Sequence, residues 1–357
     1  MGDHLARIAA RDGAVNAFID LNADRALRLA RAADQQPKKG PLHGVPFAVK
    51  DIIDTVDLPT SWGSPIYKGF QAPRNASCVE MLMRAGAIPI GKTVTTEFAY
   101  FSPGATRNPH NLDHTPGGSS SGSAAAVADG MAVFGLGSQT AASLTRPAAY
   151  CGVFGYKASQ GSIDLQGVMG LAASLDSLGL LARGIHDLIL ARAALCGTVL
   201  PGDMQGHSSP QNIAFFKGPH WHEASQSSQD ACFSAAEALR FAGVSVTDLE
   251  SPAEFTHLSE CHKTVMAFEV ARARHFEFRS HPEQLSSAFY GLIETGLSIS
   301  RADYDAALAA RDSGEAALAN LLSSHDAIMT PAAPSGAPAG IEATGDPLFS
   351  RLWTLMR

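Results

Sequence analysis

The stretch over residues 116–147, PGGSSSGSAAAVADGMAVFGLGSQTAASLTRP, constrains the fold of this chain more than any other. A Gly/Ser-rich turn at 117–123 precedes an Ala-rich segment, and a second turn of small residues at 137–143 precedes Arg146 and Pro147. Glycine lets a backbone turn tightly and approach other groups closely. We therefore expect two tight turns that bring the backbone against a neighbouring element or a ligand.

Three interpretations of these turns follow from this stretch alone. A phosphate cradle is disfavoured, because the spacing G-x-x-x-x-G-K-[ST] and its lysine are absent from the stretch. A nucleophile elbow of the form G-x-S-x-G fits residues 118–122 and makes Ser120 the nucleophile, although such a match arises easily in a Gly/Ser-rich run. The third interpretation is a solvated loop with no chemical role.

Composition and charge narrow the class of protein. Of the 357 residues, 45% are hydrophobic and 17% are charged, which indicates a globular chain with a sizeable core. The formal net charge of -7 gives no basic stripe for nucleic acid, so we expect a small-molecule substrate and no nucleic-acid partner. The five cysteines are widely spaced and include no C-x-x-C pair, which favours reduced thiols.

The sequence also predicts where the protein resides and what it binds. It contains no run of 18 apolar residues and no basic-then-apolar N-terminal signal, so we expect a cytoplasmic protein without a membrane partner. His43, His110 and His114 do not have the spacing of metal ligands. We expect no metal and no cofactor.

Hydrophobic periodicity predicts alternating helices and strands, which is typical of an α/β layer architecture. We expect a capping box formed by Ser77 and Glu80 at the start of one helix, and Gly197 at the end of another. The expected helices lie within 4–34 and at 77–86, 123–133, 186–196, 229–242 and most of 255–323. The expected strands are 45–53, 87–90, 212–216, 244–247 and 326–330.

Several ordered segments of the sequence resemble the amidase signature family. They are 42–51, 91–98, 116–123, 137–147, 151–157 and 174–177. The similarity is near-continuous over 40–185 and fainter over 186–357. The resemblance implies an α/β fold that forms a single large domain over 1–357, with a central mixed β-sheet covered by helices on both faces.

The resemblance also implies a Ser-cis-Ser-Lys catalytic triad. By position, Lys50 is the base, Ser119 relays the proton after a cis Gly118–Ser119 peptide bond, and Ser143 is the nucleophile. A serine hydroxyl needs a neighbouring base, and a lysine serves as that base only when burial lowers its pKa. Lys50 lies within an apolar run, where such burial is expected.

The implied reaction is hydrolysis of a carboxamide through an acyl-enzyme on Ser143, with release of ammonia or an amine. The backbone N–H groups of Thr140, Ala141, Ala142 and Ser143 are expected to form the oxyanion hole. Asp176 is expected to form structural hydrogen bonds nearby.

Four further residues are candidates for contact with the substrate. Arg146 either binds a substrate carboxylate or holds a packed turn through carboxylates or carbonyls, and the structural role is favoured. Tyr100 either lines the acyl pocket or belongs to the core. Gly118 and Ser120 are also candidates for contact with the substrate.

Two departures from the family pattern motivate an alternative. Ala142 stands where glycine is usual, and if that position requires a positive φ, alanine costs about 1 kcal/mol and misaligns an oxyanion donor. The chain also stops at Arg357, where the family ordinarily continues for several tens of residues, so a missing strand is expected to leave an open sheet edge. The alternative is a catalytically impaired homologue that acts as a scaffold or binding protein.

Among active forms, we favour a stand-alone amidase that acts on a small, non-peptide amide. Gln139 stands where the A subunits of glutamine amidotransferases typically carry aspartate, which disfavours that role. Relatives are commonly homodimers, so a homodimer is the expected assembly if the chain associates.

Overall fold

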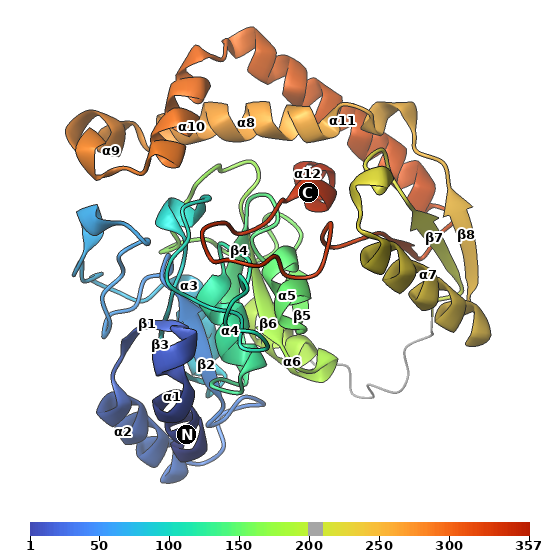
Figure 1. Cartoon of the computed structure of the whole chain (residues 1–357). Helices are drawn as coiled ribbons and strands as arrows, with labels where there is room; N and C mark the ends of the chain where they lie inside the picture. The colour runs from blue at the N-terminus through green and yellow to red at the C-terminus, as the bar shows by residue number, and fades with distance from the viewer. Residues whose placement is uncertain (199–209) are drawn as a thin grey trace.

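The computed structural model describes residues 1–198 and 210–357, which form two β-sheets and the helices around them (Figure 1). The larger sheet has six strands in the order β1-β3-β2-β4-β6-β5, and the smaller has the order β8-β7-β9. The strands are β1 (Phe18–Leu21), β2 (Pro46–Lys50), β3 (Ile88–Thr93), β4 (Phe134–Gln139), β5 (Phe154–Lys157), β6 (Ser177–Ala182), β7 (Asn212–Phe216), β8 (Ser245–Leu249) and β9 (Ala327–Met329). Strand β2 is parallel to β3 and β4, whereas β6 is antiparallel to β4. The predicted α/β fold with a central mixed sheet is confirmed.

Helices cover both faces of the larger sheet. Phe134 and Leu136 of β4 share one apolar cluster with Leu82 of α3 and Leu188 of α6, whereas Leu181 of β6 packs with α4 and α5 in a separate cluster. The helices are α1 (Gly2–Val15), α2 (Ala23–Asp34), α3 (Ser77–Arg84), α4 (Ser121–Ala128), α5 (Thr145–Cys151), α6 (Ile185–Cys196), α7 (Gln226–Phe241), α8 (Leu258–Ala273), α9 (His275–Ser280), α10 (Ser287–Ser298), α11 (Arg301–Leu322) and α12 (Leu348–Leu355).

Glycines on one face of the larger sheet let α4 and α5 approach it closely. A Cβ at Gly155 of β5 would lie 2.6 Å from the Cβ of Ala148 in α5. A Cβ at Gly137 of β4 would lie 3.0 Å from the hydroxyl oxygen of Ser120. A side chain at Gly155 would force a neighbour to shift and one at Gly137 would make a tight contact, so these glycines let the Gly/Ser-rich turn lie directly against β4.

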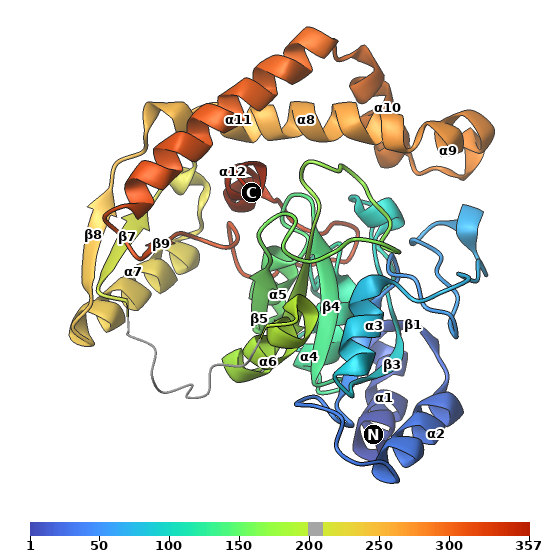
Figure 2. The same ribbon diagram turned by 180° about the vertical axis from the view of Figure 1, so that it is seen from behind.

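Helices α8, α10 and α11 form a layer across one end of the larger sheet, and α12 lies beneath them in both ribbon views (Figures 1 and 2). Phe98, in the loop after β3, stacks on Phe289 of α10 with 4.9 Å between ring centroids. Helix α8 also contacts α12. The second half of the chain therefore covers the end of the sheet at which the two small-residue turns lie.

The second half of the chain matches its predicted elements closely. Strand β7 occupies 212–216 as predicted, and α6 ends at Cys196. Gly197 follows α6 with a φ of 63°, in the left-handed region that favours glycine as a helix terminator.

No strand was predicted at β4, β5 or β6 and no helix at α5, and the predictions for the first half include three further errors. The segment 4–34 is not wholly helical, because β1 separates α1 from α2 and pairs antiparallel with β3. The capping box is wrong, since Ala76 is the N-cap of α3 and the Glu80 carboxylate accepts from Asn75 at 2.6 Å. The helix predicted over 123–133 ends at Ala128, before β4 begins.

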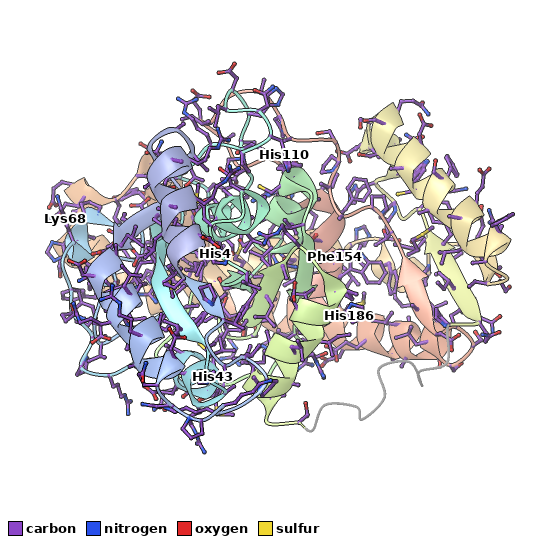
Figure 3. The ribbon with its side chains drawn as sticks, turned by 90° about the horizontal axis from the view of Figure 1, so that it is seen from below. His4, His43, Lys68, His110, Phe154 and His186 are labelled. Atoms are coloured by element: carbon purple, nitrogen blue, oxygen red, sulfur yellow. The ribbon has the colours of Figure 1, made fainter. Side chains whose placement is uncertain are left out.

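Strand β5 is an edge of the larger sheet and carries an exposed apolar side chain. Phe154, labelled in Figure 3, is 51% exposed. An edge strand presents unpaired backbone groups, so this edge is a surface at which another strand can pair.

Candidate active site

Lys50 is the last residue of β2, and its side chain is fully buried. Its Nζ donates to Ser119 Oγ at 2.7 Å and to Ser138 Oγ at 2.8 Å. Burial lowers the pKa of Lys50 to about 7, and the carboxylate of Asp176 acts in the opposite direction. Burial in β2 therefore leaves a substantial fraction of this amine uncharged at neutral pH.

Ser119 follows a cis Gly118–Ser119 peptide bond and is 1% exposed. The carbonyl of Gly118 accepts a hydrogen bond from Arg146 Nη2 at 2.6 Å. A Cβ at Gly118 would lie 2.6 Å from Cγ2 of Thr344, so only glycine fits at this position. These contacts fix the Ser119 hydroxyl against the lysine.

Ser143 lies in the turn between β4 and α5. The backbone N–H of Ser120 donates to the carbonyl of Ser143 at 3.1 Å, which joins the two small-residue turns. Ser143 is in a narrow pocket lined also by Thr140, Ala141 and Ala142. Its hydroxyl makes no hydrogen bond with any residue of 1–198 or 210–357, so nothing in the described chain competes with a substrate for it.

The turn before Ser143 has free N–H groups and occupied carbonyls. The N–H groups of Ala141, Ala142 and Ser143 donate to no described residue. The carbonyl of Thr140 accepts from His262 Nε2 at 2.7 Å, and that of Ala141 accepts from Thr354 Oγ1 at 2.7 Å. Free donors on a fixed turn are what an oxyanion hole requires.

The backbone conformation at position 142 is one that alanine adopts without strain. Ala142 is buried, and it is not among the residues of positive φ, which include Asn16, Phe98 and Ala99. The condition under which alanine would strain this turn is therefore not met. This removes the structural reason for expecting misaligned oxyanion donors.

Gln139, at the end of β4, ties the nucleophile turn to the last helix. Its side-chain oxygen accepts from the N–H groups of Leu144 and Thr145, each at 3.1 Å. Its amide nitrogen donates to Thr354 Oγ1 of α12 at 3.0 Å. Thr145 Oγ1 also bonds Ser350 Oγ of α12 at 3.0 Å. Helix α12 is thus part of the frame that holds Ser143.

Asp176 and His262 also hold the nucleophile turn, because both bond Thr140. The Asp176 carboxylate accepts from Thr140 Oγ1 at 2.6 Å and from the N–H groups of Leu171 and Ala172, and burial raises its pKa to about 6. Burial lowers the pKa of His262 to about 4, so the ring is neutral at pH 7. Its Nε2 carries the proton, because the Thr140 carbonyl only accepts.

Arg146 is buried and bonds the chain through both terminal nitrogens, whereas its buried Nε has no hydrogen-bond partner among the described residues. Nη1 donates to the carbonyl of Gly345 at 2.5 Å, and Nη2 donates to Gly118 and to Thr344 Oγ1. Burial lowers the pKa of Arg146 to about 10. The guanidinium lines the Ser143 pocket, and both of its terminal nitrogens are already bonded to the protein.

Tyr100 and Ser120 occupy different environments. Tyr100 lines the Ser143 pocket together with Phe101, with 4.8 Å between their ring centroids. Ser120 is fully buried, and its hydroxyl donates to the carbonyl of Ser138 and accepts from its N–H, both at 3.3 Å. The structure therefore brings Tyr100 to the pocket and directs the Ser120 hydroxyl to the backbone of β4.

Sequence reasoning did not identify Ser138, His262 or Thr354. Ser138 could have been found from the alternation of side chains along a strand, because it lies on the same face of β4 as the buried Phe134 and Leu136. On that face its hydroxyl accepts the hydrogen bond from Lys50. His262 and Thr354 come from helices more than 100 residues away and carry no local motif.

Within the described ranges, no three or more His, Cys, Asp or Glu side chains are placed to hold a metal ion. His110 and His114 bond the backbone carbonyls of Cys151 and Ala337 at 2.9 Å and 2.7 Å. None of the helices in 1–198 and 210–357 is both long and apolar enough to cross a bilayer.

A serine hydroxyl and backbone N–H groups that bond no described residue, side by side in one pocket, are what nucleophilic catalysis at a carbonyl carbon requires. The family model described as Amidase matches residues 3–356, and the chain belongs to the amidase family. A crystal structure of an amidase superposes with a TM-score of 0.90 at 27% identity, over 99% of this chain and 85% of that one. The peptide amidase from Stenotrophomonas maltophilia gives a TM-score of 0.80 at 26% identity, over 99% of this chain and 83% of that one.

Among curated proteins, the chain is similar to the A subunit of the glutamyl-tRNA(Gln) amidotransferase of Anaeromyxobacter sp. (strain K). The two are 44% identical over 216 residues, which is 58% of this chain and 44% of the relative. The chain thus aligns with less than half the length of this relative. These comparisons establish the family of the chain, and its relatives include both amidases and amidotransferase subunits.

Proposed function

We propose that this chain hydrolyses a carboxamide of a small, non-peptide molecule through an acyl-enzyme on Ser143. The observation that supports this best is the 2.7 Å hydrogen bond from Lys50 Nζ to Ser119 Oγ, made by a buried amine whose pKa is lowered to about 7. A base with a pKa near the working pH is the most effective at accepting a proton in the transition state.

The chemistry requires a proton path from Ser143 to Lys50. In the first step, neutral Lys50 accepts the proton of Ser119, and Ser119 accepts the proton of Ser143 as Ser143 Oγ bonds to the amide carbon. The carbonyl oxygen becomes an oxyanion, which the N–H groups of Ala141, Ala142 and Ser143 stabilise.

The tetrahedral intermediate collapses when its C–N bond breaks and the leaving nitrogen takes a proton back along the same path. Water then attacks the Ser143 ester, gives its proton to the path and releases the carboxylic acid, which restores both serines. Ser138 accepts a second hydrogen bond from Lys50, so it orients the amine toward Ser119 throughout.

A glutamine amidotransferase A subunit is the second candidate, and the 44% identity to one such protein favours it. Gln139 bears on this choice. It bonds the turn residues Leu144 and Thr145 and the α12 residue Thr354, so this uncharged side chain holds the nucleophile turn to α12 of the same chain. This supports a site that works without a partner subunit.

The test is ammonia release from neutral linear amides of two to six carbons and from a peptide amide. We expect the wild type and Ser120→Ala to hydrolyse linear amides, and Ser143→Ala to be inactive. Loss of activity in Ser120→Ala with activity retained in Ser143→Ala would support the nucleophile-elbow interpretation. Activity found only with partner subunits and an aminoacylated tRNA would identify the second candidate.

A further inference from the structure

Arg351, which bonds no residue in the part of the chain that the structure describes, lies beside the candidate active site. Arg351 is on α12, next to Ser350, whose hydroxyl bonds Thr145 in the nucleophile turn. The Nε of Arg351 is buried and has no hydrogen-bond partner, and the side chain forms no ion pair with residues 1–198 or 210–357. The side chain of Arg351 is partly buried and its Nε is shielded from solvent, so a bound molecule that supplies an acceptor would be favoured here.

The cavity at Arg351 adjoins the pocket of Ser143. Phe101 and Pro347 line both spaces, so they share two walls. Pro347 and Arg351 are four residues apart and lie on one face of the α12 segment. The charge of Arg351 also acts on Tyr100, which lines the Ser143 pocket. Phe101 and Pro347 are therefore common to the Ser143 pocket and to the cavity that Arg351 lines.

The charges around Arg351 leave its hydrogen-bond donors available. Asp346 and Glu342 line the same cavity, but both residues are exposed. The Asp346 carboxylate accepts from the N–H of Leu348, and the Glu342 carboxylate accepts from the N–H of Ile341. Burial lowers the pKa of Arg351, whereas Asp346, Tyr100 and Glu260 act in the opposite direction without bonding it. Arg146 is also near enough to act on it, but its terminal nitrogens are bonded to backbone carbonyls and Thr344.

We propose that Arg351 determines specificity by binding a carboxylate on the acyl portion of the substrate, so that the chain prefers monoamides of dicarboxylic acids. This rests on the proposed function. The planar guanidinium presents donors in a fork that matches a carboxylate, and a bidentate pair supplies both strength and orientation. Arg146, the sequence candidate for this role, has both terminal nitrogens bonded and only its Nε without a partner, whereas no donor of Arg351 bonds a residue of 1–198 or 210–357.

The test compares kcat/KM for succinamate and glutaramate with kcat/KM for the neutral amides butyramide and valeramide. We expect the wild type to prefer the two acids, and Arg351→Gln to lower that preference by about 10- to 100-fold, mainly through KM. At 1.4 kcal/mol per tenfold, this equals about 1.4 to 2.8 kcal/mol. Arg351→Lys should restore part of the preference. The matched control is Arg301→Gln on the outer helix α11, where Arg301 pairs with exposed Asp305, and it should keep the full preference.

A second measurement separates this proposal from the proposed function. Glutarate, a product-like dicarboxylate, should bind the Ser143→Ala protein by calorimetry and fail to bind Ser143→Ala/Arg351→Gln, with circular dichroism showing that both are folded. Equal kcat/KM for charged and neutral amides, or equal glutarate binding by the two variants, overturns the role of Arg351 and leaves amide hydrolysis intact. Absence of hydrolysis for every amide, together with an unlabelled Ser143, overturns both proposals.

Discussion

The buried amine of Lys50 makes activity depend on pH in a way that an ordinary lysine would not. With a pKa of about 7, half of the Lys50 side chains are neutral at pH 7, about 9% at pH 6 and about 91% at pH 8. A lysine with the usual pKa of about 10.4 is neutral in only about 1 of 2,500 molecules at pH 7. Burial therefore increases the fraction of Lys50 side chains that are neutral, and so able to accept a proton, about 1,000-fold at pH 7.

The assay is the second-order rate of Ser143 modification by a fluorophosphonate, measured from pH 5.5 to 9.5. We expect the rate to rise about fivefold between pH 6 and 7, about twofold between pH 7 and 8, and to level off above. Lys50→Met should abolish the pH-dependent rate. A rate that climbs tenfold per unit through pH 9, or one that is flat from pH 6, would refute the reasoning.

The same shift predicts a stability difference with a definite sign. The folded-state pKa of Lys50 lies below its unfolded value, so between pH 7 and 10 the unfolded chain binds more protons and the wild type gains stability as pH rises. Lys50→Met lacks this dependence. The free energy of unfolding of the wild type should therefore increase by about 2 kcal/mol relative to Lys50→Met between pH 7 and 9, measured by urea denaturation.

Three further predictions concern the turns around Ser143. Ala142→Gly should change the rate of amide hydrolysis by less than about threefold, because Ala142 has no positive φ to relieve; a gain of about 100-fold would instead support the impaired-homologue alternative. Thr354→Val removes two hydrogen bonds to the nucleophile turn, so the free energy of unfolding should fall by about 1 to 3 kcal/mol and Ser143 labelling should slow. Ser120→Ala should cost a similar free energy of unfolding and leave the fluorophosphonate adduct on Ser143.

The sequence predicted local elements best where the hydrophobic pattern agreed with a clear terminator. Strand β7 follows from the compact apolar run 212–216, and α6 ends where Gly197 adopts a left-handed φ. Strand β1 was missed because its four residues lie between two helices and it is stabilised by pairing with β3, at a distance of about 70 residues in sequence. The capping box failed because Asn75 binds the Glu80 carboxylate instead.

In the candidate site, too, residues within recognisable sequence motifs were predicted, and residues on helices distant in sequence were not. Lys50, Ser119 and Ser143 were identified together because each lies in one of the ordered motifs that resemble the amidase signature family, although 93 residues separate Lys50 from Ser143. The frame that holds Ser143 comes from His262 on α8 and Thr354 on α12, whose contacts span 122 and 213 residues. Arg351 was missed for a related reason, because only the fold shows that its Nε is buried without a partner.

Locating the fluorophosphonate adduct by peptide mass spectrometry tests the central claim most directly. The purified chain is labelled at pH 8, digested and sequenced by mass. We predict a single adduct on Ser143 in the wild type, and none in Ser143→Ala or Lys50→Met proteins that circular dichroism shows to be folded. An adduct on Ser120, or no adduct on a folded wild-type chain, would contradict the account.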